Sequence, residues 1–496
     1  MSKTSSKSHI LMFPYPAQGH MLPLLDLAHE LHVRGVPITI LVTPKNLPKL
    51  NTLLAKHPSI NTLVLPFPNH PLIPAGIENV QDLPPNYFLP MMHAMSELYN
   101  PILEWFRGCT CPPTAIVSDF FLGWTQVLAV ELGIPRVVFS PSGAMALSVT
   151  SLLWRDLPEI GNGDDENVMF EFGNVPNSPS FPWWQLSPIY RNYKQGDKQS
   201  EFIREEMLAN LVSWGMVFNT FDELESVYLD HLRKHFWVER VLAIGPLQPV
   251  KGDNDAERGG SNSVVTSGIT AWLDGCPDHS VVYVCFGSQA VLSNKQMEEL
   301  ASGLEISGTR FIWCVKDPTM GHKKNEYGVI PSGFENRMEG KGLVIRGWAP
   351  QVLVLSHQAI GSFLTHCGWN SVLESLIAGV PMLAWPMGAD QYVNATLLVD
   401  RMGVAARVCE GAGAIPNAYE LAQELAKSVS ENNITRRARA VELSKAALAT
   451  VKEGGNSCKS LDTLIEDLDH ELATRKSQEM ITGGSFGCNG VATIHD

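Results

Sequence analysis

The residue types best suited to chemistry lie between residues 348 and 391. The apolar run 360–364 predicts a buried strand, and the apolar spacing after Ser371 predicts a helix. A strand that leads into a helix N-terminus through a glycine directs backbone N–H groups and the positive end of the helix dipole towards one point. His366 and Ser371 add side-chain donors there, and Glu374, one turn into the helix, can accept hydrogen bonds from sugar hydroxyls. The pattern therefore predicts a site for an anionic leaving group.

A second reactive position precedes a helix near the N-terminus. His20 follows Gly19 after the short apolar strand 10–14, at the carboxyl edge where parallel sheets bind their ligands. A neutral imidazole there can remove a proton from an acceptor hydroxyl, because its pKa lies near the operating pH. Asp119 directly follows the strand 115–118, and a buried carboxylate on one ring nitrogen would stabilise the imidazolium that forms. The alternatives are a helix-capping histidine and, for Asp119, a helix N-cap.

Residues 348–391 resemble the C-terminal nucleotide-sugar box of plant family 1 glycosyltransferases, which use UDP-sugars. The resemblance rests on the opening Trp-Ala-Pro-Gln, the central His-x-Gly-Trp-Asn-Ser-x-x-Glu and the closing Asp-Gln. It implies a GT-B fold, in which two doubly wound, Rossmann-like α/β domains face each other across a cleft. It also implies inverting transfer of glucose from UDP-glucose to a hydroxyl of a small lipophilic acceptor, such as a flavonoid or another phenolic, giving a β-O-glucoside.

The same resemblance assigns a role to each matching residue. It places the catalytic base on His20 and the partner of this base on Asp119. It also implies a set of donor-binding residues. Their implied roles are to stack on uracil, to contact the uridine, to bind the diphosphate or to hydrogen-bond the hydroxyls of the ribose and the sugar. They are Ser288, Trp348, Ala349, Gln351, His366, Gly368, Trp369, Asn370, Ser371, Glu374, Asp390 and Gln391. The alternatives are a core tryptophan at Trp348, a turn cap at Ser288 and a solvated helix residue at Glu374.

An acceptor pocket is expected from side chains of the first half of the chain. The candidates share aromatic, methionine or small character, which suits a flat apolar ligand. They are Tyr15, Gly19, Phe88, Met92, Phe121, Ser142, Trp183, Trp184 and Met207, and many of them could equally belong to the core. Residues 19–27, 42–46 and 65–68 most resemble the small plant subgroup that acts on flavonols and simple phenolics. A UDP-rhamnose or UDP-xylose donor and a terpenoid or benzoate acceptor remain alternatives.

The elements that must position these residues form two alternating series of strands and helices, which predict parallel βαβ units. The first series comprises strands 10–14, 38–42 and 115–118 and a helix over 21–32, with a turn at 17–20. The second comprises strands 280–286, 311–315 and 343–346 and a helix that opens with a capping box at 293–296 and runs through residue 304. Residues 161–188 are interpreted as an irregular loop or substrate flap.

A polar, Gly- and Ser-rich stretch separates the two series and is typical of a linker. We therefore expect an acceptor-binding domain over 1–248, a linker over 249–268 and a UDP-sugar-binding domain over 269–459. A helix over 460–473 is expected to pack back on the first domain, and 474–496 is expected to be disordered. The Gly-x-Ser-x-Gly of residues 483–487 matches a hydrolase motif but lacks the flanking strand and helix that the motif requires.

Composition argues against several other classes of protein. The 496 residues carry a net charge of −14, which disfavours a nucleic-acid surface because phosphate binding needs clustered Lys and Arg. The nine cysteines are scattered without zinc-site spacing, and no Asp-x-Asp lies beside the donor box, so no metal cofactor is expected. No apolar run approaches the ~18 residues of a membrane span, and no signal-peptide pattern is present. These features predict a cytoplasmic protein. We also expect a monomer.

Two other functions fit alternating strands and helices. A nicotinamide dehydrogenase would need GxGxxG and a P-loop kinase would need GxxxxGK[S/T], and neither motif occurs. A sugar-nucleotide-binding protein without transferase activity would not need His20 and Asp119.

Overall fold

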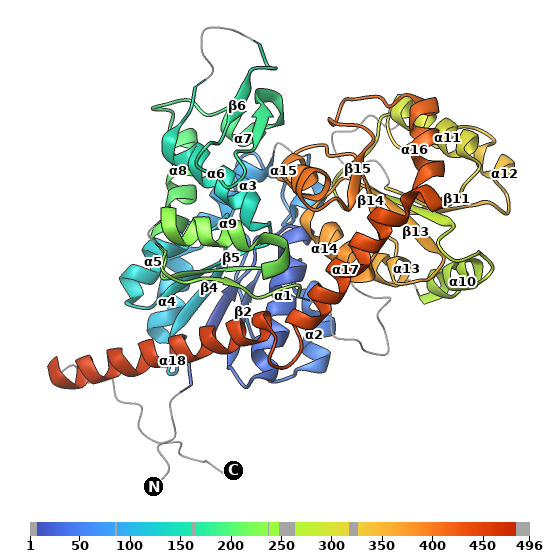
Figure 1. The fold of residues 1–496 in the computed structure, drawn as a ribbon. Coiled ribbons are helices and arrows are strands. Elements are labelled where there is room, and N and C mark those ends of the chain that lie inside the picture. Colours follow the sequence, from blue (N-terminus) through green and yellow to red (C-terminus); the bar gives the residue numbers. More distant parts are fainter. Residues whose placement is uncertain are drawn as a thin grey trace.

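Two parallel sheets organise the chain into two lobes (Figure 1). The computed structural model describes residues 7–84, 87–159, 165–236, 238–247, 263–316 and 326–482. Within these ranges, the first sheet has seven strands in the order β3-β2-β1-β4-β5-β8-β9, and the second has six in the order β12-β11-β10-β13-β14-β15. Both orders reverse direction beside the first strand of the sheet, which is the doubly wound arrangement that places a ligand site at the carboxyl ends of the strands. The predicted pair of doubly wound α/β domains is confirmed.

The strands are short and mostly buried, as expected for sheets covered by helices on both faces. Their bounds are β1 (Ile10–Phe13), β2 (Ile38–Val42), β3 (Asn61–Val64), β4 (Ala115–Asp119), β5 (Arg136–Ser140), β6 (Met169–Glu171), β7 (Ser180–Pro182), β8 (Gly215–Phe218), β9 (Val241–Ala243), β10 (Val281–Cys285), β11 (Arg310–Val315), β12 (Gly342–Arg346), β13 (Ile360–Thr365), β14 (Met382–Ala384) and β15 (Ala405–Arg407). All of them are parallel to their neighbours except β6 and β7, which form a separate antiparallel pair.

Helices connect the strands and cover the sheets. In the first lobe they are α1 (Gln18–Val33), α2 (Asn51–Lys56), α3 (Phe88–Ser96), α4 (Tyr99–Gly108), α5 (Thr125–Leu132), α6 (Ala144–Asp156), α7 (Pro188–Arg191), α8 (Lys198–Ala209) and α9 (Asp222–His235). In the second part of the chain they are α10 (Ser263–Asp274), α11 (Asn294–Ser307), α12 (Phe334–Arg337), α13 (Gln351–Leu355), α14 (Trp369–Ala378), α15 (Gln391–Thr396), α16 (Ala418–Ser428), α17 (Ile434–Thr450) and α18 (Asn456–Thr482). None of the described helices has the length and apolar character needed to cross a bilayer.

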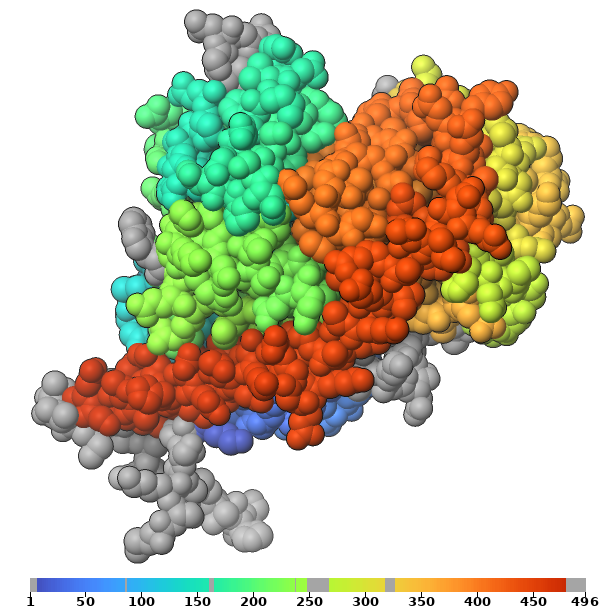
Figure 2. Space-filling model, viewed as in Figure 1, coloured from blue at the N-terminus to red at the C-terminus, as the bar shows by residue number. Residues whose placement is uncertain are grey.

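The final helix returns to the first lobe. From α17 the chain turns into α18, which lies along the first lobe (Figures 1 and 2). Leu461, Leu464 and Leu468 of this helix are buried in the same core as Val217 and Ile244 of the first lobe. The spacing of the three leucines places them on one helix face, which explains why α18 packs there.

Several boundaries differ from those predicted. The predicted turn over 17–20 is wrong, because α1 already begins at Gln18 and His20 therefore lies in its first turn. The predicted irregular stretch 161–188 contains the β6–β7 pair and a short 3₁₀ turn over Trp183–Gln185, and its residues 161–164 lie outside the described ranges. The capping box is present, with Ser293 as the N-cap of α11.

The ends of the predicted domains are only partly described. Helix α18 begins at Asn456 and continues to Thr482, so part of the tail expected to be disordered is helical. The Gly-x-Ser-x-Gly motif over 483–487 lies outside the described residues. The same holds for the predicted linker up to residue 262, and α10 starts within the remainder of that stretch.

Candidate active site

A cleft of about 1220 Å³ lies between the two sheets and is lined by residues from both of them. Its walls come from segments that follow the carboxyl ends of strands. Residues 18–20 follow β1, residues 120–121 follow β4, and residues 141–142 follow β5. Residues 286–292, 347–352, 366–371 and 387–391 follow strands of the second sheet. The carboxyl edges of both sheets thus meet at one site, as the doubly wound topology requires.

His20 and Asp119 form a hydrogen-bonded pair in the first wall. The Nδ1 atom of His20 lies 2.8 Å from Oδ2 of Asp119. The histidine side chain is 16% exposed while the aspartate is fully buried, so the imidazole is the member that a ligand can reach. The other carboxylate oxygen of Asp119 accepts the backbone N–H of Phe121 at 2.9 Å, which fixes the orientation of the carboxylate. The Phe121 ring stacks on the imidazole with centroids 5.1 Å apart.

A buried arginine lies behind this pair. Nε of Arg136 donates to the hydroxyl of Ser118 at 2.9 Å, and one terminal nitrogen donates to the backbone oxygen of Leu122 at 3.2 Å. Burial lowers the pKa of Arg136 to about 10, so the guanidinium remains charged at neutral pH. The charges of Glu206 and Asp119 partly oppose the effect of burial by raising the pKa of Arg136.

His366 forms the centre of the opposite wall. It directly follows β13, and its ring is held between Gly287 and Gly368. A Cβ atom at Gly287 would lie 2.6 Å from the imidazole, and one at Gly368 would lie 2.5 Å from Nε2. Both positions therefore require glycine for the ring to fit. Burial lowers the pKa of His366 to about 4, so its imidazole is neutral at pH 7 and can donate one N–H to a ligand.

The second turn of α14 carries Glu374, the predicted ribose-binding residue. Gly368 is the N-cap of this helix and has no capping side chain. Nε2 of Gln351 donates to the hydroxyl of Ser371 at 2.9 Å and to Oε2 of Glu374 at 2.7 Å. The half-buried Trp348 lines the cleft, while its neighbour Ala349 is buried. These predicted residues are therefore brought together, with Ser288 across the same cleft.

Two side chains of α14 join the lobes. The indole Nε1 of Trp369 donates to the backbone oxygen of Asn219 at 2.7 Å, and the amide of Asn370 donates to the backbone oxygen of Gly19 at 2.9 Å. Gly19 immediately precedes His20, so the second bond links α14 directly to the segment that carries the imidazole. The roles predicted for Trp369 and Asn370 did not include these hydrogen bonds between the two walls.

Asp390 and Gln391 close the cleft at the start of α15. Burial raises the pKa of Asp390, while hydrogen bonds from the side chains of Asn394 and Ser142 oppose that rise. Ser142 belongs to the first lobe, so this carboxylate also lies at the junction of the two walls. The side-chain oxygen of Gln391 accepts the backbone N–H groups of Met387 and Gly388 at 2.9 and 3.1 Å. Its amide NH2 group is consequently the end that can donate to a ligand.

The predicted acceptor-binding residues fall into two groups. Those that line the cleft are Gly19, Phe88, Phe121, Ser142 and Met207. Tyr15 and Met92 are fully buried in the core, where Tyr15 donates to the backbone oxygen of Phe88. Trp183 packs against Phe170 and Tyr190, and Trp184 packs against Tyr392. The structure therefore does not bring Tyr15, Met92, Trp183 and Trp184 into the cleft wall.

Sequence reasoning missed the contribution of α6. Ala146, Thr150 and Leu153 line the cleft at helical spacing, together with Leu147 and Trp154 of the same helix. The signal was present as an apolar run with a helical period after the glycine at position 143. Asp82 and Lys316, one from each lobe, also line the cleft and carry no motif.

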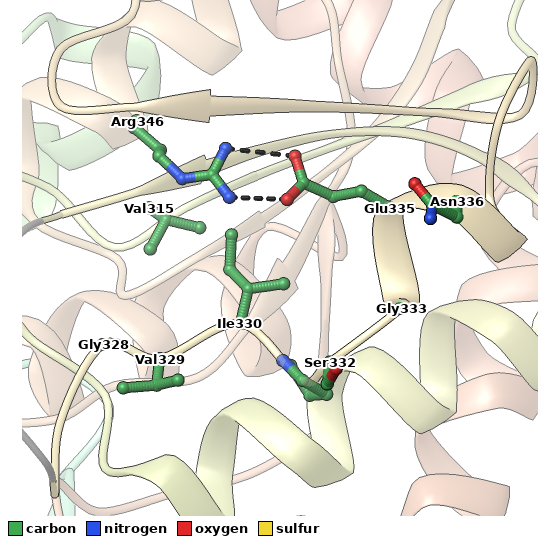
Figure 3. A pocket seen from close by; sticks show the side chains of 10 residues that line it. Val315, Gly328, Val329, Ile330, Ser332, Gly333, Glu335, Asn336 and Arg346 are labelled. Atoms are coloured by element: carbon green, nitrogen blue, oxygen red, sulfur yellow. Dashed lines mark hydrogen bonds and ion pairs between the residues drawn. The ribbon is translucent and has the colours of Figure 1, made fainter.

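A smaller cavity of about 350 Å³ lies in the second lobe beside residues 328–333 (Figure 3). Its charged groups, Glu335 and Arg346, are paired with each other at 2.5 and 3.0 Å. Its lining residues include neither a histidine nor a cysteine. The groups suited to proton transfer and anion binding therefore belong to the larger cleft. Across the described ranges, no group of three or more His, Cys, Asp or Glu side chains is placed to hold a metal ion.

Residues 261–413 match the family model described as UDP-glucoronosyl and UDP-glucosyl transferase. The chain is 55% identical over 469 residues to UDP-glycosyltransferase 89B2 of Stevia rebaudiana, which covers 94% of this chain and 99% of that one. It is 52% identical over 464 residues to flavonol 3-O-glucosyltransferase UGT89B1 of Arabidopsis thaliana, covering 93% and 96% of the two chains. Crystal structures of Arabidopsis thaliana UGT89C1, complexed with UDP-L-rhamnose or with quercetin, match with TM-scores of 0.77 and 0.76. Each is 36% identical over 94% of this chain and 100% of that one.

Proposed function

Because the chain belongs to the plant family 1 UDP-glycosyltransferases and has their GT-B fold, we propose that it glucosylates a hydroxyl group of a flavonol or related phenol. The donor is UDP-glucose, and the product is a β-O-glucoside formed with inversion at the anomeric carbon. One observation carries the proposal. His20, which is hydrogen-bonded to the buried Asp119, and the anion-binding group around His366 line the same cleft from opposite lobes.

The proposed base is His20. Asp119 occupies Nδ1, so Nε2 is the ring nitrogen that takes the proton of the acceptor hydroxyl. The phenolic oxygen then attacks the anomeric carbon from the side opposite the diphosphate, and the bond to UDP breaks. Asp119 stabilises the imidazolium formed in this step, and the stacked Phe121 ring restricts rotation of the imidazole. A single displacement of this kind inverts the configuration of the carbon.

The proposed leaving-group site relies on neutral donors. The N–H of His366, the hydroxyl of Ser371 and the free N–H groups at the start of α14 can bind the negative charge that develops on UDP. Together with the positive end of the helix dipole, these groups allow departure of the diphosphate without a divalent cation. We therefore propose that transfer requires no metal.

The acceptor class follows from the cleft and from the relatives. Phe121 stacks on His20, and Phe88, Leu153 and Met207 add apolar walls to the same cleft, which suits a flat aromatic ring. One relative is named a flavonol 3-O-glucosyltransferase, and another was crystallised with quercetin. These names support a flavonol acceptor. A terpenoid or benzoate acceptor is the alternative that an acceptor screen would distinguish.

The donor is proposed from the end of the nucleotide-sugar box. Asp390 can accept from sugar hydroxyls, and the NH2 of Gln391 can donate to one, which suits the adjacent equatorial hydroxyls of glucose. UDP-rhamnose is the second candidate, because UGT89C1 was crystallised with UDP-L-rhamnose. UDP-xylose is the third. A cytoplasmic, monomeric enzyme is also proposed.

A screen of acceptors tests this function. The purified full chain is incubated with UDP-glucose and a panel of flavonols, coumarins, triterpenoids and benzoates, and both UDP release and product mass are measured. His20→Ala should reduce turnover by ~10²–10⁴-fold while UDP still binds, because it removes only the general base. His470→Ala, which changes an exposed histidine of α18, is the matched control and should retain turnover. UDP binding without UDP release in the native protein, for every acceptor, would favour a non-catalytic binding protein.

A further inference from the structure

Two cysteines lie side by side on neighbouring strands of the second sheet. Cys285 is the last residue of β10, and Cys314 is the penultimate residue of β11. The two strands are parallel and pair Val284 with Trp313, so the next residue of each strand continues that register. Neighbouring strands lie about 4.7–4.9 Å apart, which falls within the roughly 4.4–6.8 Å between Cα atoms that a disulfide accepts. Both thiols also line the large cleft.

The two thiols contact the loops that form the nucleotide pocket. The Sγ atom of Cys314 donates to the backbone oxygen of Gly347 at 3.2 Å and is also hydrogen-bonded by the backbone N–H of Ala349. These contacts lie on both sides of Trp348, the residue predicted to stack on uracil. Cys285 is hydrogen-bonded by the backbone N–H of Gly287, the residue packed against the His366 ring.

The surroundings favour ionisation of one member of the pair. The thiol of Cys314 has a single hydrogen, which it can direct to the sulfur of Cys285 in place of the oxygen of Gly347. That interaction, followed by the N–H of Gly287, lowers the pKa of Cys285 although burial acts in the opposite direction. The same interaction, together with burial, raises the pKa of Cys314. The first thiolate to form is thus held beside a second thiol that remains protonated. Such a pair reacts with oxidants faster than an isolated buried cysteine, because the thiolate is the nucleophile.

We propose that Cys285 and Cys314 form a reversible disulfide in the nucleotide pocket, that two-electron oxidants such as hydrogen peroxide produce it, and that it weakens UDP-sugar binding. The effect on binding rests on the proposed function, whereas formation of the bond does not. The Cys285 thiolate attacks one oxygen of the peroxide, which gives a sulfenic acid and, with one proton, a molecule of water. The thiol of Cys314 then attacks the Cys285 sulfur and releases a second water. Two thiols and one peroxide become one disulfide and two waters, and a dithiol reductant reverses the change.

The disulfide weakens nucleotide binding through the backbone of residues 347–349. Once the Cys314 sulfur carries no hydrogen, its bond to the oxygen of Gly347 is lost. The segment that positions Trp348 then loses a contact to the sheet beneath it. Losing one such bond and part of the stacking on the base should raise the dissociation constant of UDP by about tenfold.

The experiment measures the bond and the binding separately. Reduced full-length protein is treated with graded hydrogen peroxide and digested without reductant, and the digest is analysed by mass spectrometry. The expected product is a cross-linked pair of peptides that contain Cys285 and Cys314 and lack two hydrogens. UDP affinity, measured by calorimetry before and after oxidation, should fall about tenfold and recover with dithiothreitol. UDP bound beforehand should slow formation of the bond.

Matched variants separate this pair from the other cysteines. In Cys314→Ala and in Cys285→Ala, treatment with peroxide should leave the affinity for UDP unchanged. Cys276→Ser changes a thiol that donates to the backbone oxygen of Trp272 and should keep the full response. Absence of the cross-linked peptides at peroxide doses that lower UDP affinity would overturn the proposal, and so would an equal loss of affinity in Cys314→Ala. If the reduced protein binds no UDP, the proposed function fails, and the peptide analysis still decides whether the disulfide forms.

Discussion

Replacing Asp119 by asparagine tests the proposed proton transfer while keeping the size of the side chain. In the native site Oδ2 lies 2.8 Å from Nδ1 of His20, and Oδ1 accepts the N–H of Phe121 at 2.9 Å. An asparagine should keep its oxygen on the Phe121 N–H, because this donor is fixed by the backbone, and turn its NH2 towards His20. Nδ1 must then accept a hydrogen bond, so the ring proton moves to Nε2. The nitrogen that faces the cleft can no longer act as a base.

The expected loss follows from the charge that the substitution removes. An imidazolium and a carboxylate about 4 Å apart attract each other by about 4 kcal/mol at an effective dielectric constant of about 20. Since each 1.36 kcal/mol corresponds to about tenfold in rate, kcat should fall by about 10³-fold. Binding of UDP-glucose should change by less than about twofold, because Asp119 is buried behind His20 and its carboxylate is hydrogen-bonded to His20 and to the backbone of Phe121, both in the first lobe.

The assay measures kcat and KM with phenolic acceptors of graded acidity. The loss in Asp119→Asn should shrink as the acceptor becomes more acidic, because an ionised phenol needs no base. Asp230→Asn changes an exposed carboxylate of α9 that pairs with Arg233, and it should behave as the native enzyme does. Thermal unfolding of each variant verifies that it is folded. A kcat within about threefold of the native value for the least acidic phenol would refute the role assigned to the pair.

Three further predictions concern the metal, the donor and the pH dependence of folding. Activity should survive excess EDTA, and a complete loss restored by Mg²⁺ or Mn²⁺ would show that the leaving-group site has been misinterpreted. The kcat/KM for UDP-glucose should exceed that for UDP-galactose by about tenfold, because the axial hydroxyl of galactose would leave a buried polar group unpaired, which costs roughly 1–3 kcal/mol. Gln391→His should reduce the ratio of kcat/KM for UDP-glucose to that for UDP-galactose, and Asp390→Ala should strongly reduce transfer of glucose. A kcat/KM for another donor that equals or exceeds the value for UDP-glucose would contradict the assignment. Burial holds the pKa of His366 at about 4 in the folded protein, against 6.5 for a histidine exposed to water. Between these two values the unfolded chain binds more protons than the folded protein does. The free energy of unfolding should therefore fall as the pH decreases from 6.5 towards 4. The free energy of unfolding in urea should fall between pH 7 and pH 5 by roughly 1–2 kcal/mol less in His366→Asn than in the native protein. An equal fall in both proteins would argue against a neutral, buried imidazole.

The nucleotide-sugar box could be predicted because local sequence determines its structure. Strand β13 matches the expected run 360–364 to within one residue, and helix α14 begins at Trp369, three residues before the apolar spacing that predicted it. Burial on both faces makes the strand a continuous apolar run, and glycines at positions 368 and 379 mark both ends of the helix. The start of α1 was misplaced because Ala17, its N-cap, has no side chain that accepts a hydrogen bond. Nothing in the local pattern distinguishes such a start from a turn.

The parts that sequence could not predict depend on contacts between distant segments. The bond from Trp369 to the backbone of Asn219 and that from Asn370 to Gly19 each join the two lobes. The residues of the acceptor wall could not be predicted for the same reason, because contacts between distant segments decide which side chains face the cleft. Trp183 and Trp184 have the composition of a ligand platform, yet their partners are other aromatic side chains, and α6 supplies the wall instead. Aromatic content alone cannot separate core from pocket, because both environments favour it.

The anomeric configuration of the product tests the central claim most directly. UDP-α-glucose and a flavonol are incubated with the native enzyme, and the purified glucoside is analysed by proton NMR. A single displacement assisted by His20 predicts only the β-glucoside, recognised by the large coupling between the axial protons at C1 and C2, with one UDP released for each glucoside formed. An α-glucoside, or UDP release without glucoside, would contradict the mechanism.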